Sequence, residues 1–216
     1  MIYTVIGKVG EKVGAELPSS INEYIDNTKN ISLKEARRTA YSILLIAMDR
    51  LFPDIKVKLS RTDKGKPYIE RDVNPIYISL THSNGLCAVA VCDDREVGID
   101  IEASVDKDRA KRLERRFLDG VSIPKRSLQA EILYFSDGEL SKECPNGIKL
   151  PCTCSEGFTD KWVCSEAAMK CEGGGFSSFT NLERLFSTYD FLLLNIETGG
   201  EIYSLSIASE KTKKMR

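Results

Sequence analysis

Three short runs rich in β-branched residues in the middle of the chain constrain the fold most. They are IYISL (76–80), LCAVAVC (86–92) and VGIDI (97–101), with the turn residues SNG (83–85) and DDRE (93–96) between them. β-Branched residues pack well on a pleated surface, and clusters of turn residues end strands. The pattern therefore predicts three strands that follow one another as a meander.

Two long helices are expected, one on each side of this block. The first covers Ser32–Phe52, where Ser32 and Glu35 have the spacing of a capping box and Pro53 follows the end. The second covers Thr159–Glu172 and ends at the glycines 173–175, since glycine favours the left-handed conformation that terminates helices.

The remaining strands are expected nearer the two ends of the chain. IYTVIGKV (2–9) and IKVKL (55–59) alternate in polarity, and GKPYI (65–69) is typical of a turn that enters an edge strand. TYDFLLLNIE (188–197) and EIYSLSIA (201–208) are separated by Gly199-Gly200 and predict a β-hairpin. The segment 104–127 is expected to begin as a polar helix, and 136–158 to consist mainly of loops. Composition and periodicity alone thus favour a soluble α+β chain.

Composition excludes several classes of protein. The 216 residues are 42% hydrophobic with 31 Lys+Arg against 32 Asp+Glu, which argues against a disordered chain and against a general nucleic-acid binder. Neither a run long enough to cross a bilayer nor a signal peptide is found, so we expect a cytoplasmic protein with no membrane partner. The seven cysteines, five of them within 144–171, lack the spacing of a zinc site; in the cytosol they are expected to be reduced.

Two acids and one histidine lie on the predicted strands. Asp100 and Glu102 are two residues apart in VGIDIE (97–102), so their side chains share one face of a strand. They are either Mg²⁺ ligands, which suits hard oxygen donors, or solvated acids at a strand end. His82, the only histidine, follows Thr81 in ISLTHS (78–83), and either contacts a phosphate or has a structural role.

The second helix carries a further acid–base pair. Glu166 and Lys170 in WVCSEAAMK (162–170) are four residues apart and share a helix face. They form either an ordinary helix ion pair or a carboxylate that faces a metal with an ammonium that faces a phosphate.

Taken in order, GKPYI, ISLTHS, VGIDIE and FTDKWVCSEAAMKCEGGGF resemble the motifs of the 4′-phosphopantetheinyl transferases. The resemblance is close over 65–102 and 158–176 and extends loosely to Arg38 on the first helix. The length and the mid-chain VGIDIE resemble the longer, surfactin-synthetase type. That type implies a monomer of two pseudo-symmetric halves, each a long helix packed on a small antiparallel sheet, here 1–103 and 104–216, with the active site in the cleft between them.

The resemblance also implies a reaction and a role for each matching residue. The family transfers the phosphopantetheine arm of coenzyme A to a serine of an apo acyl or peptidyl carrier protein and releases 3′,5′-ADP. Glu166 and Lys170 would then be catalytic, with Lys170 on the pyrophosphate, and Asp100, Glu102 and Glu166 would bind Mg²⁺. The remaining coenzyme A contacts would come from Arg38, Thr81 and His82 around the 3′-phosphate and from Lys66 and Pro67 around the adenine.

One residue departs from the family pattern, because Ser165 stands where the family has a lysine. Lys161, one turn earlier, is the residue that we expect to compensate. The departure leaves open a non-catalytic homologue that binds coenzyme A or a carrier protein, and a Mg²⁺-dependent phosphohydrolase is a third reading. Eight Lys and Arg residues within 105–126 against four acids are either a docking surface for an acidic carrier protein or a solvated helix face.

Overall fold

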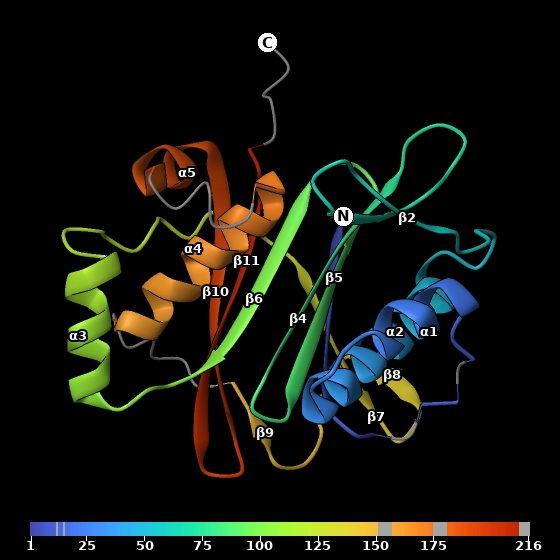
Figure 1. The fold of residues 1–216 in the computed structure, drawn as a ribbon, viewed down its shortest axis with the longest axis horizontal. Helices are drawn as coiled ribbons and strands as arrows, with labels where there is room; N and C mark the ends of the chain where they lie inside the picture. The colour runs from blue at the N-terminus through green and yellow to red at the C-terminus, as the bar shows by residue number, and fades with distance from the viewer. Residues whose placement is uncertain (12, 15, 151–156, 175–180, 212–216) are drawn as a thin grey trace.

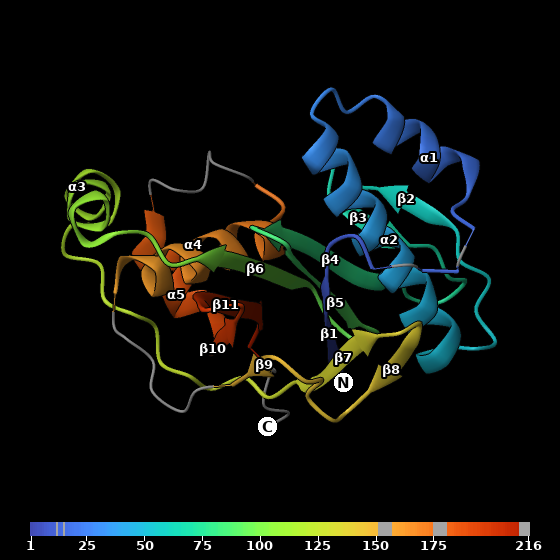
Figure 2. The same ribbon diagram turned by 90° about the horizontal axis from the view of Figure 1, so that it is seen from below.

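The computed structural model describes residues 1–11, 13–14, 16–150, 157–174 and 181–211, which form two β-sheets and the helices that cover them (Figures 1 and 2). The helices are α1 (Ser19–Asp26), α2 (Ile31–Leu51), α3 (Lys107–Phe117), α4 (Phe158–Glu172) and α5 (Leu182–Thr188). The strands are β1 (Ile2–Lys8), β2 (Leu59–Arg61), β3 (Pro67–Ile69), β4 (Ile76–Ser83), β5 (Leu86–Cys92), β6 (Val97–Ala103), β7 (Glu131–Ser136), β8 (Glu139–Ser141), β9 (Ile148–Lys149), β10 (Tyr189–Thr198) and β11 (Glu201–Glu210). The α+β class predicted from the sequence is confirmed.

The first sheet has the strand order β2-β3-β4-β5-β1-β7-β8. The interior strand β1 pairs antiparallel with β5, the middle strand, and parallel with β7. The apolar face of α2, with Ile43, Leu44 and Met48 fully buried, packs on this sheet against side chains such as Val5 and Val89. The expected strands at IYTVIGKV and LCAVAVC are therefore present, and both are central.

The second sheet has the order β6-β11-β10-β9. β10 and β11 form the predicted hairpin, because Thr198 pairs with Glu201 and leaves a turn of two residues. Gly199 and Gly200 in that turn have φ of +60° and +80°, a conformation that favours glycine.

The predicted meander is wrong for its third strand. β4 and β5 are paired neighbours, but β6 pairs with β11 in the other sheet. β7, in turn, comes from the second half of the chain and pairs with β1. Each sheet therefore contains at least one strand from the other expected half of the chain, 1–103 or 104–216.

The two sheets pack face to face, and β6 shows the consequence most clearly. Val97, Ile99 and Ile101 enter the apolar core between the sheets. The alternate positions Gly98, Asp100 and Glu102 lie on the opposite face, which α4 covers (Figure 1). The alternation of a strand thus places the two predicted acids under the second long helix.

Helix and strand ends differ in places from the expectations. The N-cap of α2 is Asn30, whose side chain accepts a hydrogen bond from the Leu33 N–H, so the proposed capping box at Ser32 is wrong. IKVKL is not a strand, because β2 begins only at Leu59. α4 ends as predicted at Gly173, with φ of +72°, whereas Gly175, Cys152 and Cys154 lie outside the described residues. Within the described part of the chain, none of the helices has the length and apolarity that a transmembrane segment needs.

Candidate active site

One cleft of about 590 Å³ brings most of the predicted site residues together. Its walls come from α1 and α2 on one side, from α4 on the other, and from the β2–β3 turn, β4 and β6 between them (Figures 1 and 2). The predicted residues that line it are Lys66, Pro67, Thr81, His82, Asp100, Glu102, Glu166 and Lys170.

A ladder of side-chain hydroxyls joins β4 to β6 along the floor of this cleft. The hydroxyls of Ser79, Thr81 and Ser83 accept hydrogen bonds from the N–H groups of Ile99, Ile101 and Ala103, at 3.1, 3.3 and 3.3 Å. β6 is an edge strand, so these backbone groups would otherwise lack a partner. Residues two apart on a strand point to one face, which is why the S-x-T-x-S spacing achieves this contact.

The same hydroxyls orient the two acids. The Thr81 hydroxyl donates to Asp100 Oδ1 at 3.0 Å, and the Ser83 hydroxyl donates to Glu102 Oε2 at 2.8 Å. Sequence reasoning assigned no role to Ser79 or Ser83. Hydroxyl residues at alternate positions of ISLTHS were the available signal.

Asp100 is the most deeply buried acid of the cleft, at 4% exposure. Lys170 Nζ on α4 donates to Asp100 Oδ1 at 2.7 Å and to the Ile99 carbonyl at 3.1 Å. The other carboxylate oxygen, Oδ2, is buried and has no hydrogen-bond partner within the described residues. A buried, unpartnered carboxylate oxygen is costly, and a cation is the partner that would best relieve that cost.

Glu166 lies on the α4 wall, close to the two acids of β6. Burial raises the pKa of Glu166 to about 7, with Asp100 and Glu102 adding to the rise and Lys170 opposing it. Burial likewise raises the pKa of Glu102, and Asp100 contributes to that rise. Asp100 thus raises the pKa of both Glu102 and Glu166, and neighbouring carboxylates that disfavour one another's charge attract a cation.

The carboxylate oxygens of these three acids are the kind of ligand that a hard divalent cation prefers, but in this structure they do not yet point to one common position. Among the described residues, the one group of three or more His, Cys, Asp or Glu ligand atoms within 4.8 Å of one another is Cys92, Asp93 and Asp94. The oxygens of Asp100, Glu102 and Glu166 thus require side-chain rotation before all three contact one ion. Carboxylates and water are the usual ligands of Mg²⁺.

The opposite wall of the cleft is cationic and aromatic. Arg61 and Arg37 lie over the ring of Tyr24, with the guanidinium carbons 4.3 and 5.0 Å from its centroid, and Lys64 lines the cleft beside them. His82 also lines the cleft. Burial lowers the pKa of His82, and the charges of Lys170 and Arg37 lower it further. Guanidinium and ammonium groups in one cleft are suited to phosphate.

Arg38, which the resemblance assigned to the 3′-phosphate, does not line this cleft. Its guanidinium donates to Asn22 and pairs with Asp26 at 3.6 Å. Arg37 instead faces the cleft, together with Ala40 and Tyr41 three and four residues further along α2. One residue corresponds to a rotation of about 100° around a helix, so the neighbouring arginine occupies the wall.

Lys66 lines the cleft, but its ammonium is already engaged. Nζ donates to the Cys171 carbonyl near the end of α4 at 2.7 Å and pairs with Glu96. Its side chain is only 9% exposed. Lys66 therefore ties the β2–β3 turn to α4, and Pro67 lines the cleft next to it.

The expectation that Lys161 replaces the missing lysine finds no geometric support. Lys161 pairs with Glu114 on α3 and does not line the cleft. Ser165 is fully buried, and its hydroxyl donates to the Lys161 carbonyl at 2.8 Å. The side chain of Ser165 is therefore buried on a face of α4 that does not line the cleft, whereas Trp162, Glu166 and Lys170 line it.

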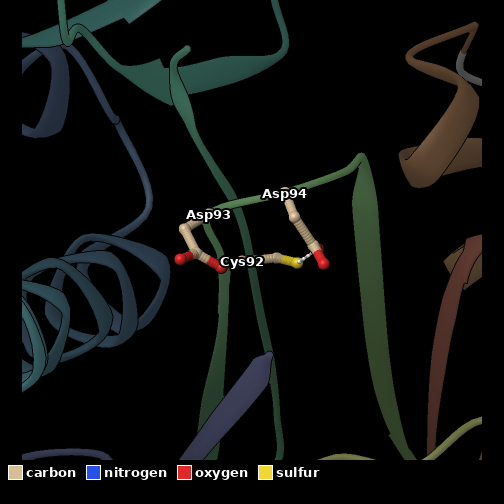
Figure 3. A group of neighbouring side chains, drawn as sticks. All are labelled: Cys92, Asp93 and Asp94. Carbon is tan, nitrogen blue, oxygen red and sulfur yellow. Dashed lines mark hydrogen bonds between the residues drawn. The ribbon is translucent and has the colours of Figure 1, made fainter. Parts of the chain in front are cut away.

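Figure 3 shows the group Cys92, Asp93 and Asp94 at the end of β5, and none of the three lines the cleft. The Cys92 thiol donates to Asp94 at 2.9 Å, and the amino group of Met1 pairs with Asp93 at 3.2 Å. Burial raises the pKa of the Cys92 thiol, which disfavours the thiolate that a metal requires. These contacts account for the group without a metal.

In comparisons with known proteins, the chain matches neither a family model nor a curated protein sequence.

Proposed function

We propose that this chain is a 4′-phosphopantetheinyl transferase, which moves the phosphopantetheine group of coenzyme A to a serine of an apo acyl or peptidyl carrier protein. The observation that carries the proposal is one cleft that is lined both by three acids and Lys170 and by Arg37, Arg61, Lys64 and His82. Coenzyme A carries a 3′-phosphate and a pyrophosphate, so it needs both cations and a means of neutralising the pyrophosphate.

The size and the lining of the cleft support a ligand of this kind. About 590 Å³ lies within the range of roughly 300–1,000 Å³ that small-molecule sites occupy. Tyr24 with its two stacked arginines offers a flat cationic surface for the 3′-phosphate and adenine end. His82 lines the same cleft and would contact the 3′-phosphate.

Glu166 and Lys170 on the α4 side of the cleft would carry out the transfer. The carrier serine oxygen attacks the phosphorus that bears the pantetheine arm, and the bond from that phosphorus to the bridging oxygen breaks to release 3′,5′-ADP. Glu166 accepts the serine proton. Lys170 holds the negative charge of the pyrophosphate, after exchanging part of its present contact with Asp100.

Asp100, Glu102 and Glu166 would hold Mg²⁺, to which Asp100 would offer its Oδ2 atom, buried and without a hydrogen-bond partner among the described residues. When bound, the ion supplies positive charge to the pyrophosphate. The hydroxyls of Thr81 and Ser83 keep the two β6 acids in place.

The proposal includes the wider architecture that the family implies. The chain would act as a cytoplasmic monomer of two pseudo-symmetric halves, with this cleft between them. α3 supports a carrier-protein partner, because its 11 residues are exposed or half-buried and carry Arg115 and Arg116 in the last turn. A KM for the carrier that rises steeply with salt supports docking there, and an unchanged KM contradicts it.

The experiment that tests the function is the intact mass of an apo carrier protein after incubation with this protein, coenzyme A and Mg²⁺. We expect the mass of one phosphopantetheine to be added by the wild type and by Glu183→Gln, an exposed acid on α5, and not by Glu166→Gln. Coenzyme A binding without any mass gain across several carrier types would instead favour a non-catalytic homologue. Release of 3′,5′-ADP without a carrier protein would favour a phosphohydrolase.

A further inference from the structure

A second polar cluster lies beneath the first turn of α4, separate from the cleft. It consists of Asp160 on α4, Asn195 on β10 and Ser204 on β11, which are 0%, 3% and 2% exposed. Asp160 Oδ1 accepts hydrogen bonds from Asn195 Nδ2 at 3.1 Å and from the Ser204 hydroxyl at 2.5 Å. None of the three lines the cleft, so the proposed transferase leaves this cluster unexplained.

The hydrogen-bond donors of the cluster are all used, whereas acceptors remain. Asn195 Nδ2 has two hydrogens, and these go to Asp160 and to the Ser204 oxygen at 3.2 Å. The Ser204 hydroxyl has one hydrogen, which goes to Asp160. Asp160 Oδ2 and Asn195 Oδ1 are both buried and have no hydrogen-bond partner in the part of the chain that the structure describes. The two side chains are hydrogen-bonded to each other through Asp160 Oδ1 and Asn195 Nδ2, and their remaining oxygens, which only accept, require a donor or a cation from outside.

The charge of Asp160 points to a cation rather than to a neutral donor. No ion pair to Asp160 is present among the described side chains, and buried carboxylates are normally paired or bound to a metal. The first turn of a helix favours a negative charge, but no N–H group within the described residues reaches Oδ2. The neighbouring Ser206 hydroxyl, also buried and without a partner there, is a further oxygen on the same face of β11.

We propose that a monovalent metal ion, Na⁺ or K⁺, binds between Asp160 Oδ2 and Asn195 Oδ1. The ligands on offer are carboxylate, amide and hydroxyl oxygens, which suit hard cations. The cluster supplies one formal negative charge, so a monovalent ion neutralises it, whereas a divalent ion would leave a net positive charge in the core.

The ion would fix the beginning of α4 to the hairpin of β10 and β11. Ser204 pairs in register with Glu102, and Ser206 with Asp100, so the ion site adjoins the floor of the cleft. It would therefore hold in place the helix that carries Glu166.

Thermal unfolding in different salts tests the proposal on the intact chain. At constant ionic strength, we expect the Tm of the wild type to rise by a few degrees when choline chloride is replaced by NaCl or KCl, and to rise with the logarithm of the ion concentration. Separate NaCl and KCl series identify the ion. Asp160→Asn should abolish this dependence, since it removes the negative charge that the ion neutralises, and the control Asp119→Asn, an exposed acid, should retain it.

A crystallographic experiment decides the matter even if Asp160→Asn fails to fold. Crystals of the wild type soaked in thallium(I), an anomalous scatterer that replaces K⁺, should show a peak between Asp160 Oδ2 and Asn195 Oδ1. A water molecule at that place without anomalous signal in thallium(I), together with a Tm that is equal in choline, sodium and potassium salts, would overturn the proposal.

Discussion

Gly98 allows α4 to lie directly on β6, and replacing it tests how the site is assembled. A Cβ atom at position 98 would lie 2.0 Å from the Ala167 carbonyl oxygen and 2.4 Å from the Cys171 nitrogen. Both are backbone atoms of α4, so no side-chain rotation relieves the clash. Because Cβ contacts below 3.0 Å are essentially never seen, Gly98→Ala must move the helix by about 1 Å.

The cost follows from what that movement breaks. Overpacking of a core costs about 1–3 kcal/mol. The displaced helix would also lose the 2.7 Å contact between Lys170 and Asp100, and a hydrogen bond to a charged group contributes about 1.5–3 kcal/mol. We therefore expect the free energy of unfolding to fall by about 3 kcal/mol. A misplacement of about 1 Å in the site should lower phosphopantetheine transfer by roughly 100-fold.

Urea unfolding, with transfer measured by carrier mass, is the assay, and Gly7→Ala is the matched control. Gly7 is also a strand glycine under a long helix, but its added Cβ would meet the Ile43 Cδ1 atom at 2.6 Å, the far end of a flexible side chain. Rotation of Ile43 should limit the loss to about 0.5–1.5 kcal/mol. If Gly98→Ala proves as stable as Gly7→Ala, the close seating of α4 on β6 is refuted.

Three further predictions concern the cleft. Arg37→Ala should weaken coenzyme A binding about tenfold or more, since a charged phosphate contact contributes about 1.5–3 kcal/mol, while Arg38→Ala should leave it unchanged in calorimetry. Burial raises the pKa of Glu166 from 4.5 to about 7, so folding favours its protonated form. The free energy of unfolding of the wild type, relative to that of Glu166→Gln, should therefore be highest below pH 4.5 and fall by about 1–3 kcal/mol as the pH rises through 7. A difference between the two proteins in urea unfolding that is the same at pH 5 and at pH 8 would contradict this. Thr81→Val should cost about 1–3 kcal/mol by leaving a β6 N–H and Asp100 short of partners, and Thr81→Ser should restore the loss.

Elements fixed by local chemistry could be predicted from the sequence. The end of α4 follows from the left-handed conformation of Gly173, and the β10–β11 hairpin follows from Gly199-Gly200 between two apolar runs. Asp100 and Glu102 were placed on one face of a strand by alternation alone, and that placement is what brings both into the cleft.

Pairings over long distances could not be predicted in the same way. β6 was assigned to a meander because consecutive strands are usually neighbours. Its partner β11 is about 100 residues away, and nothing in VGIDIE distinguishes an edge of one sheet from an edge of the other. The choice of Arg37 over Arg38 could have been made from the sequence. Arg37 lies three residues before Ala40, which belongs to the apolar stripe of α2, so these two residues share a face of the helix.

The hydroxyl ladder between β4 and β6 uses the same side chains to join the two sheets and to position the two acids. Ser79, Thr81 and Ser83 satisfy the free edge of β6 by accepting its N–H groups. A hydroxyl that accepts still has a hydrogen to donate, and Thr81 and Ser83 donate theirs to Asp100 and Glu102. Valine in place of Thr81 or Ser83 would keep the strand but remove both the hydrogen bond to the β6 backbone and the one to the acid. With Thr81 replaced, Asp100 would be held, among the described residues, by Lys170 alone.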